Sequence, residues 1–292
     1  MRRAFLRVAA TILFPSTVLS AQDATAGAPD PSSVEPGYVH VGPDPLFYEV
    51  AGEGPVLVLI HDGLIHREIW ENQFSLFAQE YRAVRYDRRG YGASPVASAP
   101  YSDVEDLAAI LEHLDIETAR LMGMSSGGQL TIDFTLAHPE RVDAMVLVGA
   151  VVRGFSYTQH LLTRGGRMSS DLPEAEVLAY IFSEDPYEVY RENREASERL
   201  VELGARGYRP GEREFFSSFS GTPSVERLGE IQVPTLILAG EFDIPDVHAH
   251  AGAINAGIRG SRREIIPHSG HLIPLEQPEV FNRVVLEFLR GL

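Results

Sequence analysis

A serine flanked by glycines is the strongest chemical signal in the sequence. In Gly123-Met124-Ser125-Ser126-Gly127, the serine follows an apolar strand-like pair and precedes a segment with helical spacing. A Gly-x-Ser-x-Gly turn between a strand and a helix is sharp, so small residues flank the serine and the strained bend exposes its hydroxyl. The following helix points its N-terminal N–H groups at any anion formed there. Ser125 is therefore the candidate nucleophile.

A serine hydroxyl also needs an imidazole to accept its proton and a carboxylate to fix the tautomer of that imidazole. In the chain order serine, acid, histidine, the acid follows a late strand. The apolar run Thr235–Ala239 leads into a short loop that contains three acidic side chains. We expect Asp243 to be the acid, with Glu241 and Asp246 as the alternatives.

The base is expected on the loop after the last strand. The sequence Ile265-Ile266-Pro267-His268-Ser269-Gly270-His271 offers two histidines there. We expect His271, which follows the glycine, to be the base, and His268 to be a bystander.

The tetrahedral oxyanion of such a reaction needs two N–H donors that are already in place. The N–H of Ser126, directly after the nucleophile, is one candidate. The other comes from the loop after an early strand, and the run Val56–Ile60 ends in a loop that contains Gly63. Gly63 and Ser126 are therefore the expected oxyanion hole.

These residues must be positioned by a sheet. Short β-branched runs alternate with amphipathic segments after Tyr38, which predicts an α/β fold with a mostly parallel, doubly wound sheet. We expect strands at Leu46–Val50, Val56–Ile60, Arg82–Tyr86, Ala119–Met122, Ala144–Val148, Thr235–Leu238 and Arg263–Ile266. We expect helices at Trp70–Glu80, Val104–Leu114, Gly127–Ala137, Ala249–Ala256 and Pro278–Leu289.

The alternation stops between residues 152 and 223. This segment is charged and aromatic, with helical-looking pieces at Glu174–Phe182 and Tyr187–Leu203 and no strand-like run. Its aromatic content argues against a solvated tail. We expect an inserted helical cap at 152–223 over the edge where the strands end, with the core formed by 37–151 and 224–292.

Together the motifs resemble those of the α/β-hydrolase superfamily, in the branch of cap-containing serine hydrolases. Beyond the serine turn, the resemblance includes His61-x-Gly63 with Trp70, the turn Asp87–Ser94, His138–Val142 and His271–Pro278. It covers nearly the whole chain after its first residues. The resemblance implies that Asp87, Arg88 and Gly90 brace the loops as scaffold residues, and that the activity is esterase, cofactor-free haloperoxidase or enol-lactonase chemistry.

One residue departs from the family pattern. Asp62 stands where most relatives have glycine, and a carboxylate beside the oxyanion site opposes developing negative charge. Two explanations would make this carboxylate compatible with catalysis. Asp62 could point away or pair with Arg88 or Arg89, or it could replace glycine because aspartate tolerates a left-handed backbone.

The composition excludes several kinds of chemistry. The 292 residues contain no Cys, and all 25 basic residues are Arg, so thiol nucleophiles, thiolate zinc sites and lysine Schiff bases are excluded. The formal net charge is −16 with no long basic run, which argues against nucleic acid as a partner.

The first residues have the pattern of an export signal. Three arginines precede a short apolar stretch that ends in a small-residue cleavage pattern near Ser20. This stretch is too short for a membrane span. We expect a signal peptide at 1–20, a flexible linker at 21–36, and export to the periplasm or the medium by the secretory or the twin-arginine route.

The residues thus predict a serine hydrolase that acts on a small ester, lactone or similar acyl compound, without a metal or an organic cofactor. One alternative is perhydrolase or haloperoxidase-like chemistry with peroxide as the acyl acceptor. Another is hydrolysis of a carbon–carbon bond or an enol lactone by the same triad. A third, from a different class, is a catalytically silent scaffold that binds a small molecule. The sequence makes no prediction of the oligomeric state.

Overall fold

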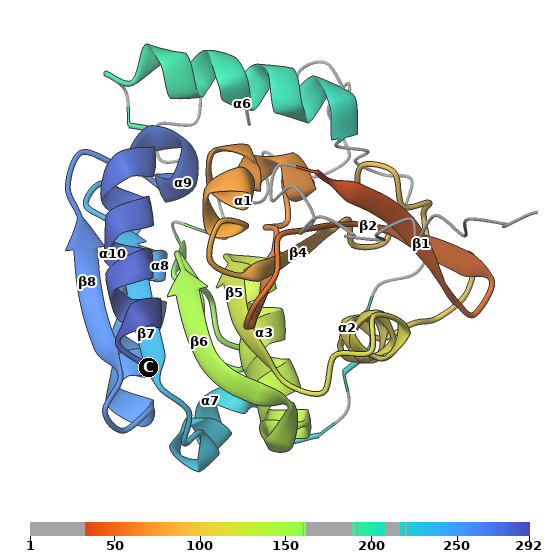
Figure 1. Cartoon of the computed structure of the whole chain (residues 1–292). Coiled ribbons are helices and arrows are strands. Elements are labelled where there is room, and N and C mark those ends of the chain that lie inside the picture. Colours follow the sequence, from red (N-terminus) through yellow and green to blue (C-terminus); the bar gives the residue numbers. More distant parts are fainter. Residues whose placement is uncertain (1–32, 160, 162–188, 191, 208–216, 220) are drawn as a thin grey trace, which may run out of the picture.

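The computed structural model describes residues 33–159, 161, 189–190, 192–207, 217–219 and 221–292. In this part of the chain, eight strands form one sheet in the order β1-β2-β4-β3-β5-β6-β7-β8 (Figure 1). Strand β2 pairs antiparallel with both β1 and β4, and all the other pairs are parallel. The strands are β1 Glu35–Val41, β2 Asp44–Ala51, β3 Val56–Ile60, β4 Arg82–Tyr86, β5 Ala119–Met124, β6 Val142–Val148, β7 Thr235–Gly240 and β8 Arg262–Ile266.

Helices connect the parallel strands, because parallel neighbours need a crossover connection, which is usually a helix. The described α-helices are α1 Glu71–Phe77, α2 Asp103–His113, α3 Ser126–Ala137, α6 Arg194–Gly207, α7 Ser224–Arg227, α8 Pro245–Gly257, α9 Ile273–Glu276 and α10 Pro278–Arg290. Short 3-10 helices lie at Arg67–Trp70, Pro139–Arg141 and Leu228–Glu230.

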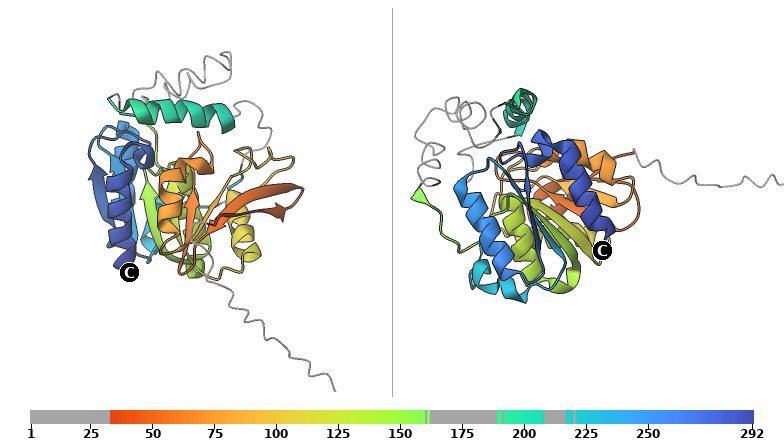
Figure 2. Two further views of the ribbon diagram at one scale, coloured as in Figure 1. Left: turned by 45° about the horizontal axis from the view of Figure 1, so that its top comes forward. Right: turned by 90° about the vertical axis from the view of Figure 1, so that its left-hand side faces the viewer.

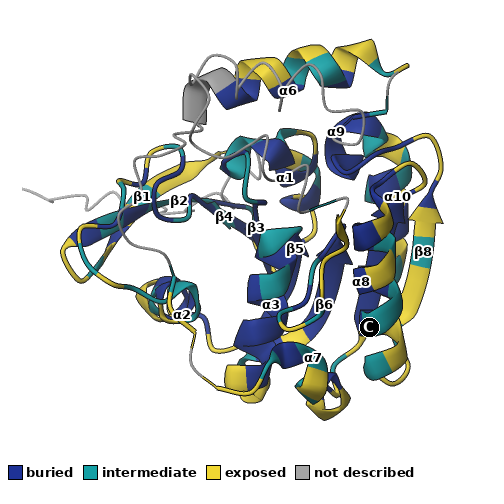
Figure 3. Cartoon of the chain, turned by 180° about the vertical axis from the view of Figure 1, so that it is seen from behind, coloured by how far each residue is buried: buried dark blue, intermediate teal, exposed yellow. Residues whose placement is uncertain are grey.

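The two faces of the sheet are buried in two separate clusters. In β3, Leu57 and Leu59 pack with α1 and α10, whereas Val58 and Ile60 pack on the opposite face with α2, α3 and α8. Figure 1 shows α1 and α10 in front of the sheet, and Figure 3 shows α2, α3 and α8 from behind. Because both faces are covered, the central strands are continuous apolar runs, which is why they were recognisable in the sequence.

Helix α6 lies across the edge of the sheet toward which the parallel strands point (Figure 2). It buries Ala196, Leu200 and Leu203 in the cluster of α1 and α10. The guanidinium of Arg199 is also hydrogen-bonded to the carboxylate of Glu71 in α1. A helix of the expected cap therefore covers the carboxyl edge of the sheet.

All seven expected strands and all five expected core helices form. Strands β3 and β4 have the expected ends, and the ends of the other elements differ by a few residues. The sequence did not predict β1, because this edge strand exposes most of its side chains and contains Pro36 and Gly37. It begins at Glu35, inside the expected linker 21–36, whose residues 21–32 lie outside the described part of the chain.

Two other expected segments fall wholly or partly outside the described residues. These are the signal peptide at 1–20 and the helical piece Glu174–Phe182. Of the expected helix Tyr187–Leu203, the described part contains α6, which starts later and runs to Gly207. Among the described residues, no helix combines the length and the apolar character that a bilayer crossing needs.

Candidate active site

Ser125 occupies the sharp turn between β5 and α3. Its φ of 52° and ψ of −115° place a non-glycine residue in a strained region of conformational space. A Cβ on Gly123 would lie 2.3 Å from the carbonyl oxygen of Gly127, and a Cβ on Gly127 would lie 2.4 Å from the carbonyl oxygen of His61. Only glycine fits at these two positions, so the flanking glycines are what allow the turn to form.

His271 and Asp243 come together at the carboxyl ends of β7 and β8. Nδ1 of His271 lies 2.8 Å from Oδ2 of Asp243, and the two residues are 8% and 5% exposed. The second carboxylate oxygen of Asp243 accepts a 2.7 Å hydrogen bond from the N–H of Ile244. With the Nδ1 proton donated to this carboxylate, Nε2 of His271 keeps its lone pair and can accept a proton.

The His271–Asp243 pair packs against the backbone next to the serine turn. A Cβ on Gly149 would lie 3.0 Å from Cε1 of His271 and 3.5 Å from Oδ2 of Asp243. The residue before it, Val148, accepts a 2.8 Å hydrogen bond from the N–H of Ser125. The structure thus gathers the nucleophile, base and acid candidates around the end of β6. Gly149 was missed in the sequence, where its only signal is a glycine directly after an apolar strand.

The alternative acids and the alternative base have other contacts. Glu241 accepts a 3.0 Å bond from the N–H of His268, and His268 itself is exposed. Asp246 accepts bonds from the N–H and the hydroxyl of Thr158, at 2.6 and 2.7 Å. Of the three acidic candidates, Asp243 is the residue whose carboxylate is hydrogen-bonded to His271.

The two expected oxyanion donors lie against one another. A Cβ on Gly63 would be 3.2 Å from Oγ of Ser126, which is the first residue of α3. The carbonyl oxygen of Gly63 accepts a 2.8 Å hydrogen bond from the hydroxyl of Tyr91, which fixes the plane of the following peptide. The loop after β3 therefore lies against the N-terminus of α3 and is anchored there by Tyr91.

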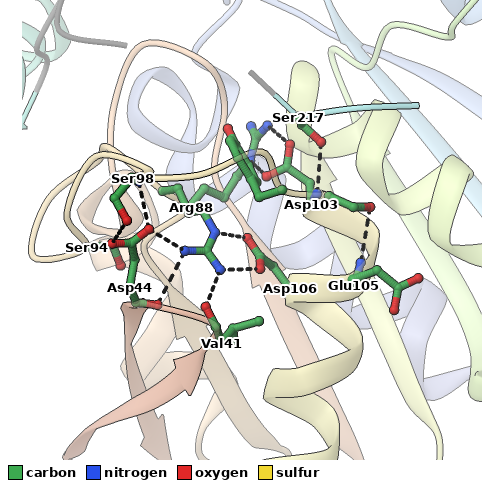
Figure 4. Close-up of polar contacts among 12 residues, drawn as sticks. Val41, Asp44, Arg88, Ser94, Ser98, Asp103, Glu105, Asp106 and Ser217 are labelled. Atoms are coloured by element: carbon green, nitrogen blue, oxygen red, sulfur yellow. Dashed lines mark hydrogen bonds and ion pairs between the residues drawn. The ribbon is translucent and has the colours of Figure 1, made fainter. Parts of the chain in front are cut away.

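Arg88 contacts this site directly, which the scaffold role expected for it did not anticipate. Its Nη1 donates to Oγ of Ser126 at 2.8 Å and approaches the carbonyl oxygen of Asp62 at 3.4 Å. The other side of the guanidinium binds the carboxylate of Asp103, whose N–H donates to Ser217 (Figure 4). A largely buried positive charge, on a side chain that is 13% exposed, thus contacts the first residue of α3.

The rest of the Asp87–Ser94 turn braces the loops, as the resemblance implied. Asp87 accepts hydrogen bonds from the backbone and the guanidinium of Arg67 at 3.0 and 2.6 Å, and from the N–H of Ala93 at 2.8 Å. Arg89 makes two bonds to Asp106, at 2.6 and 2.7 Å. Gly90 has a φ of +78°, which glycine adopts without strain.

Neither the expected ion pair with Arg88 or Arg89 nor the expected left-handed backbone explains Asp62. Its φ is not positive, so tolerance of a left-handed backbone is not the reason that aspartate stands here. Its carboxylate is not bonded to Arg88 or Arg89 either. Oδ1 accepts the N–H groups of Leu64 and Ile65, at 3.1 and 2.7 Å, in an Asx-type turn. Oδ2 is buried and has no hydrogen-bond partner among the described residues.

Burial also changes the acidity of this carboxyl. Asp62 is 1% exposed, and desolvation raises its pKa despite the two N–H bonds and the nearby charge of His271. A raised pKa favours the neutral form, which opposes an oxyanion less than a carboxylate does.

Several known proteins are similar to this chain in sequence and in architecture. Residues 57–284 match the model of the alpha/beta hydrolase family. The chain is 32% identical over 230 residues to the 2-hydroxy-6-oxononadienedioate/2-hydroxy-6-oxononatrienedioate hydrolase of Cupriavidus pinatubonensis, over 73% of this chain and 78% of that protein. It is 27% identical over 248 residues to carboxylesterase YbfK of Bacillus subtilis, over 82% and 81% of the two chains.

A solved structure gives the same result. A hydrolase from Pseudomonas aeruginosa superposes with a TM-score of 0.74 at 26% identity, over 87% of this chain and 98% of that one. The chain belongs to the alpha/beta hydrolase family, as the sequence motifs predicted. Its relatives named above are hydrolases.

Proposed function

We propose that the chain is a serine hydrolase that cleaves a small ester, lactone or related acyl compound through an acyl-enzyme. The proposal is carried by the 2.8 Å contact between His271 and Asp243. This pair packs on Gly149, next to the carbonyl that holds the backbone of Ser125. The similarity to a carboxylesterase supports the ester class.

In the first half of the reaction, Oγ of Ser125 attacks the carbonyl carbon while Nε2 of His271 accepts the hydroxyl proton. Asp243 keeps the proton on Nδ1 and stabilises the imidazolium that forms. His271 then donates its new proton to the leaving alcohol, which departs and leaves the acyl group on Ser125. In the second half, His271 takes a proton from water, and the hydroxide attacks the acyl carbon and displaces Oγ of Ser125. The carboxylic acid leaves, and His271 returns its proton to Oγ.

Negative charge on the carbonyl oxygen is stabilised by the N–H groups of Gly63 and Ser126. Each such donor is typically worth about 3 kcal/mol of the barrier. The guanidinium of Arg88, 2.8 Å from Oγ of Ser126, adds a positive charge close to the same place. A substrate carbonyl bound here meets donors that need no rearrangement.

Replacement of the nucleophile tests the proposal. We expect Ser125→Ala to lower kcat for short p-nitrophenyl esters by about 10⁴-fold or more, with an unchanged melting temperature. Ser218→Ala is the matched control, because this exposed serine donates its hydroxyl to the carbonyl of Tyr101 and is not one of the proposed catalytic residues, so kcat should stay unchanged. Full hydrolysis by Ser125→Ala would refute the proposal.

A second candidate reaction is hydrolysis of a carbon–carbon bond, which the 32% identical dienedioate hydrolase favours. Ester hydrolysis and carbon–carbon bond hydrolysis are distinguished by comparing the turnover of an ester with that of a diketone of the kind that aromatic ring cleavage produces. Adding peroxide to the ester assay tests perhydrolase chemistry. A fluorophosphonate probe, which reacts only with an activated serine, tests for a catalytically silent scaffold, since such a chain remains unlabelled.

A further inference from the structure

Glu276, the last residue of α9, holds both sides of the His271 loop. The residue is 4% exposed. One carboxylate oxygen accepts the N–H of Gly270 at 2.9 Å, and the other accepts the N–H of Leu272 at 3.1 Å. These two residues flank His271, so a single carboxylate fixes the backbone before and after the imidazole.

The same carboxylate binds a residue far away in the sequence. The oxygen that accepts Gly270 also accepts the N–H of Tyr190 at 2.6 Å. Asn193 donates from its side chain to the carbonyl oxygen of Glu276 at 2.9 Å, and its own side-chain oxygen accepts the N–H of Ala196 in α6. Both contacts come from the expected cap at 152–223.

Tyr190 reaches the acid loop as well. Its ring stacks on Phe242 with a centroid separation of 4.5 Å and an interplanar angle of 10°. Phe242 directly precedes Asp243, and its N–H donates to the carbonyl of Ser269 at 2.9 Å. Tyr190 therefore contacts the loops of the proposed acid and the proposed base.

Burying this carboxylate carries an electrostatic cost. Burial raises the pKa of Glu276 to about 7, the three N–H bonds oppose the rise, and the charge of Asp243 adds to it. A cavity of about 320 Å³ lies beside Glu276, and its lining includes Glu71, Glu195 and Arg199. An apolar residue would avoid this cost but would leave three N–H groups without an acceptor.

We propose that Glu276 is a positioning residue, which fixes the imidazole of His271 through Gly270 and Leu272 and joins that loop to Tyr190 and Asn193 of the cap. The inference rests on the proposed serine hydrolase function. It assigns Glu276 no contact with substrate, so its effect passes entirely through the backbone of the His271 loop.

The test compares Glu276→Ala and Glu276→Gln in the full chain. Alanine removes both carboxylate oxygens and with them all three N–H bonds, whereas glutamine keeps one oxygen and part of the network. Displacing a catalytic group by about 1 Å can cost about 100-fold in rate. We expect kcat for p-nitrophenyl acetate to fall about 100-fold in Glu276→Ala and about tenfold in Glu276→Gln, with KM changed less than threefold.

The rate of fluorophosphonate labelling should fall in parallel, because it depends on the imidazole and not on a substrate pocket. Gln277→Ala is the control from the next residue. Its side chain donates to the carbonyl of His268 at 3.0 Å, outside the proposed catalytic set, so kcat should stay within twofold of wild type. Tyr190→Phe should retain the stacking on Phe242 and normal kcat, whereas Tyr190→Ala should lower kcat.

Failure of the proposed function and failure of the positioning role give different results. If the wild-type chain is not labelled at Ser125, the proposed function is wrong. If the wild type is labelled but a folded Glu276→Gln variant reacts at the wild-type rate, the function stands and the positioning role is wrong. If Glu276→Ala does not fold, kcat of Glu276→Gln and of Tyr190→Ala tests the inference instead. A loss of kcat in Gln277→Ala as large as that in the Glu276 variants would also overturn the inference.

Discussion

The carboxylate of Asp62 is tied to the backbone of its own loop and not to a cation. It bonds to Leu64 and Ile65, immediately after the oxyanion candidate Gly63. The Asx-type turn restricts this loop. The residue that appeared to oppose catalysis in the sequence therefore stabilises the loop that carries a proposed donor.

Two substitutions at this position separate the role of the turn from that of the charge. Asp62→Gly removes the acceptor of two N–H groups, which typically costs about 1–3 kcal/mol for a buried donor left unsatisfied. We expect it to lower the free energy of unfolding by about 2 kcal/mol and to reduce kcat. Asp62→Asn keeps Oδ1 as an acceptor and should retain most of the free energy of unfolding and most of kcat. Urea unfolding and ester hydrolysis measure the two effects, and equal losses in both variants would contradict this account.

Residue types and spacing were enough to identify the candidates of the site, but not all of their contacts. Ser125, Asp243 and His271 each follow a parallel strand, and the carboxyl ends of such strands meet at one edge. The contact between Glu276 and Tyr190 spans 86 residues and follows no periodic pattern, so the sequence could not predict it. Nor could it predict the contact between Arg88 and Ser126, because long side chains take directions set by packing.

At the scale of elements, patterns succeeded where a segment is buried on a regular face. The central strands and the longer helices are of this kind. The exposed edge strand β1 and the four-residue helices α7 and α9 were missed, since none of them provides enough turns or alternations to show a period. The short helix α9 is what brings Glu276 beneath the His271 loop.

Helix α8 supports the segment that leaves β6 toward the expected cap. His250 of α8 is fully buried, and its Nδ1 accepts the N–H of Val152 at 2.9 Å. The rings of Phe155 and Tyr157 lie 4.9 and 5.0 Å from its imidazole. Together with the bonds from Asp246 to Thr158, this contact ties the start of the segment to the same helix that follows the proposed acid.

The contact at His250 predicts a dependence of stability on pH. Burial lowers the pKa of His250 to about 4, against the opposing charge of Asp246, whereas the unfolded chain has a value near 6.5. The unfolded state then binds more protons between these values, so the contribution is complete above about pH 6.5 and is lost as the pH falls toward 4.

His250→Asn removes this titration but can keep an oxygen in reach of the N–H of Val152. We expect the melting temperature of the wild type to fall more steeply than that of the variant between pH 6.5 and 4. Thermal unfolding followed by circular dichroism at several pH values provides the comparison. Parallel curves would show that His250 does not titrate as described.

At the scale of the whole molecule, the chain has no lysine, and arginine takes its place throughout. Arg88, Arg89 and Arg153 each make two bonds to one carboxylate, on Asp103, Asp106 and Asp133. The planar guanidinium fits such paired contacts, which a lysine ammonium does not reproduce. These ion pairs tie the loop after β4 to α2 and the segment after β6 to α3.

The first residues predict where the molecule works. We expect the chain recovered from the periplasm or the medium to begin at Ala21, after loss of the segment that contains Arg2, Arg3 and Arg7. Mass spectrometry of fractionated cells measures this directly. Replacing Arg2 and Arg3 by lysine should stop export only if the twin-arginine route is used, and a full-length product in the cytoplasm would contradict the expectation of export.

The order of the proposed groups along the chain has a consequence during synthesis. The serine turn is complete by α3, but Asp243, His271 and Glu276 all lie in the last 50 residues of the 292. A growing chain still attached to the ribosome therefore presents a serine without the partners that make it reactive. Chains released before this segment is made would not react with acyl compounds. The proposed hydrolase activity would appear only after the last 50 residues are translated.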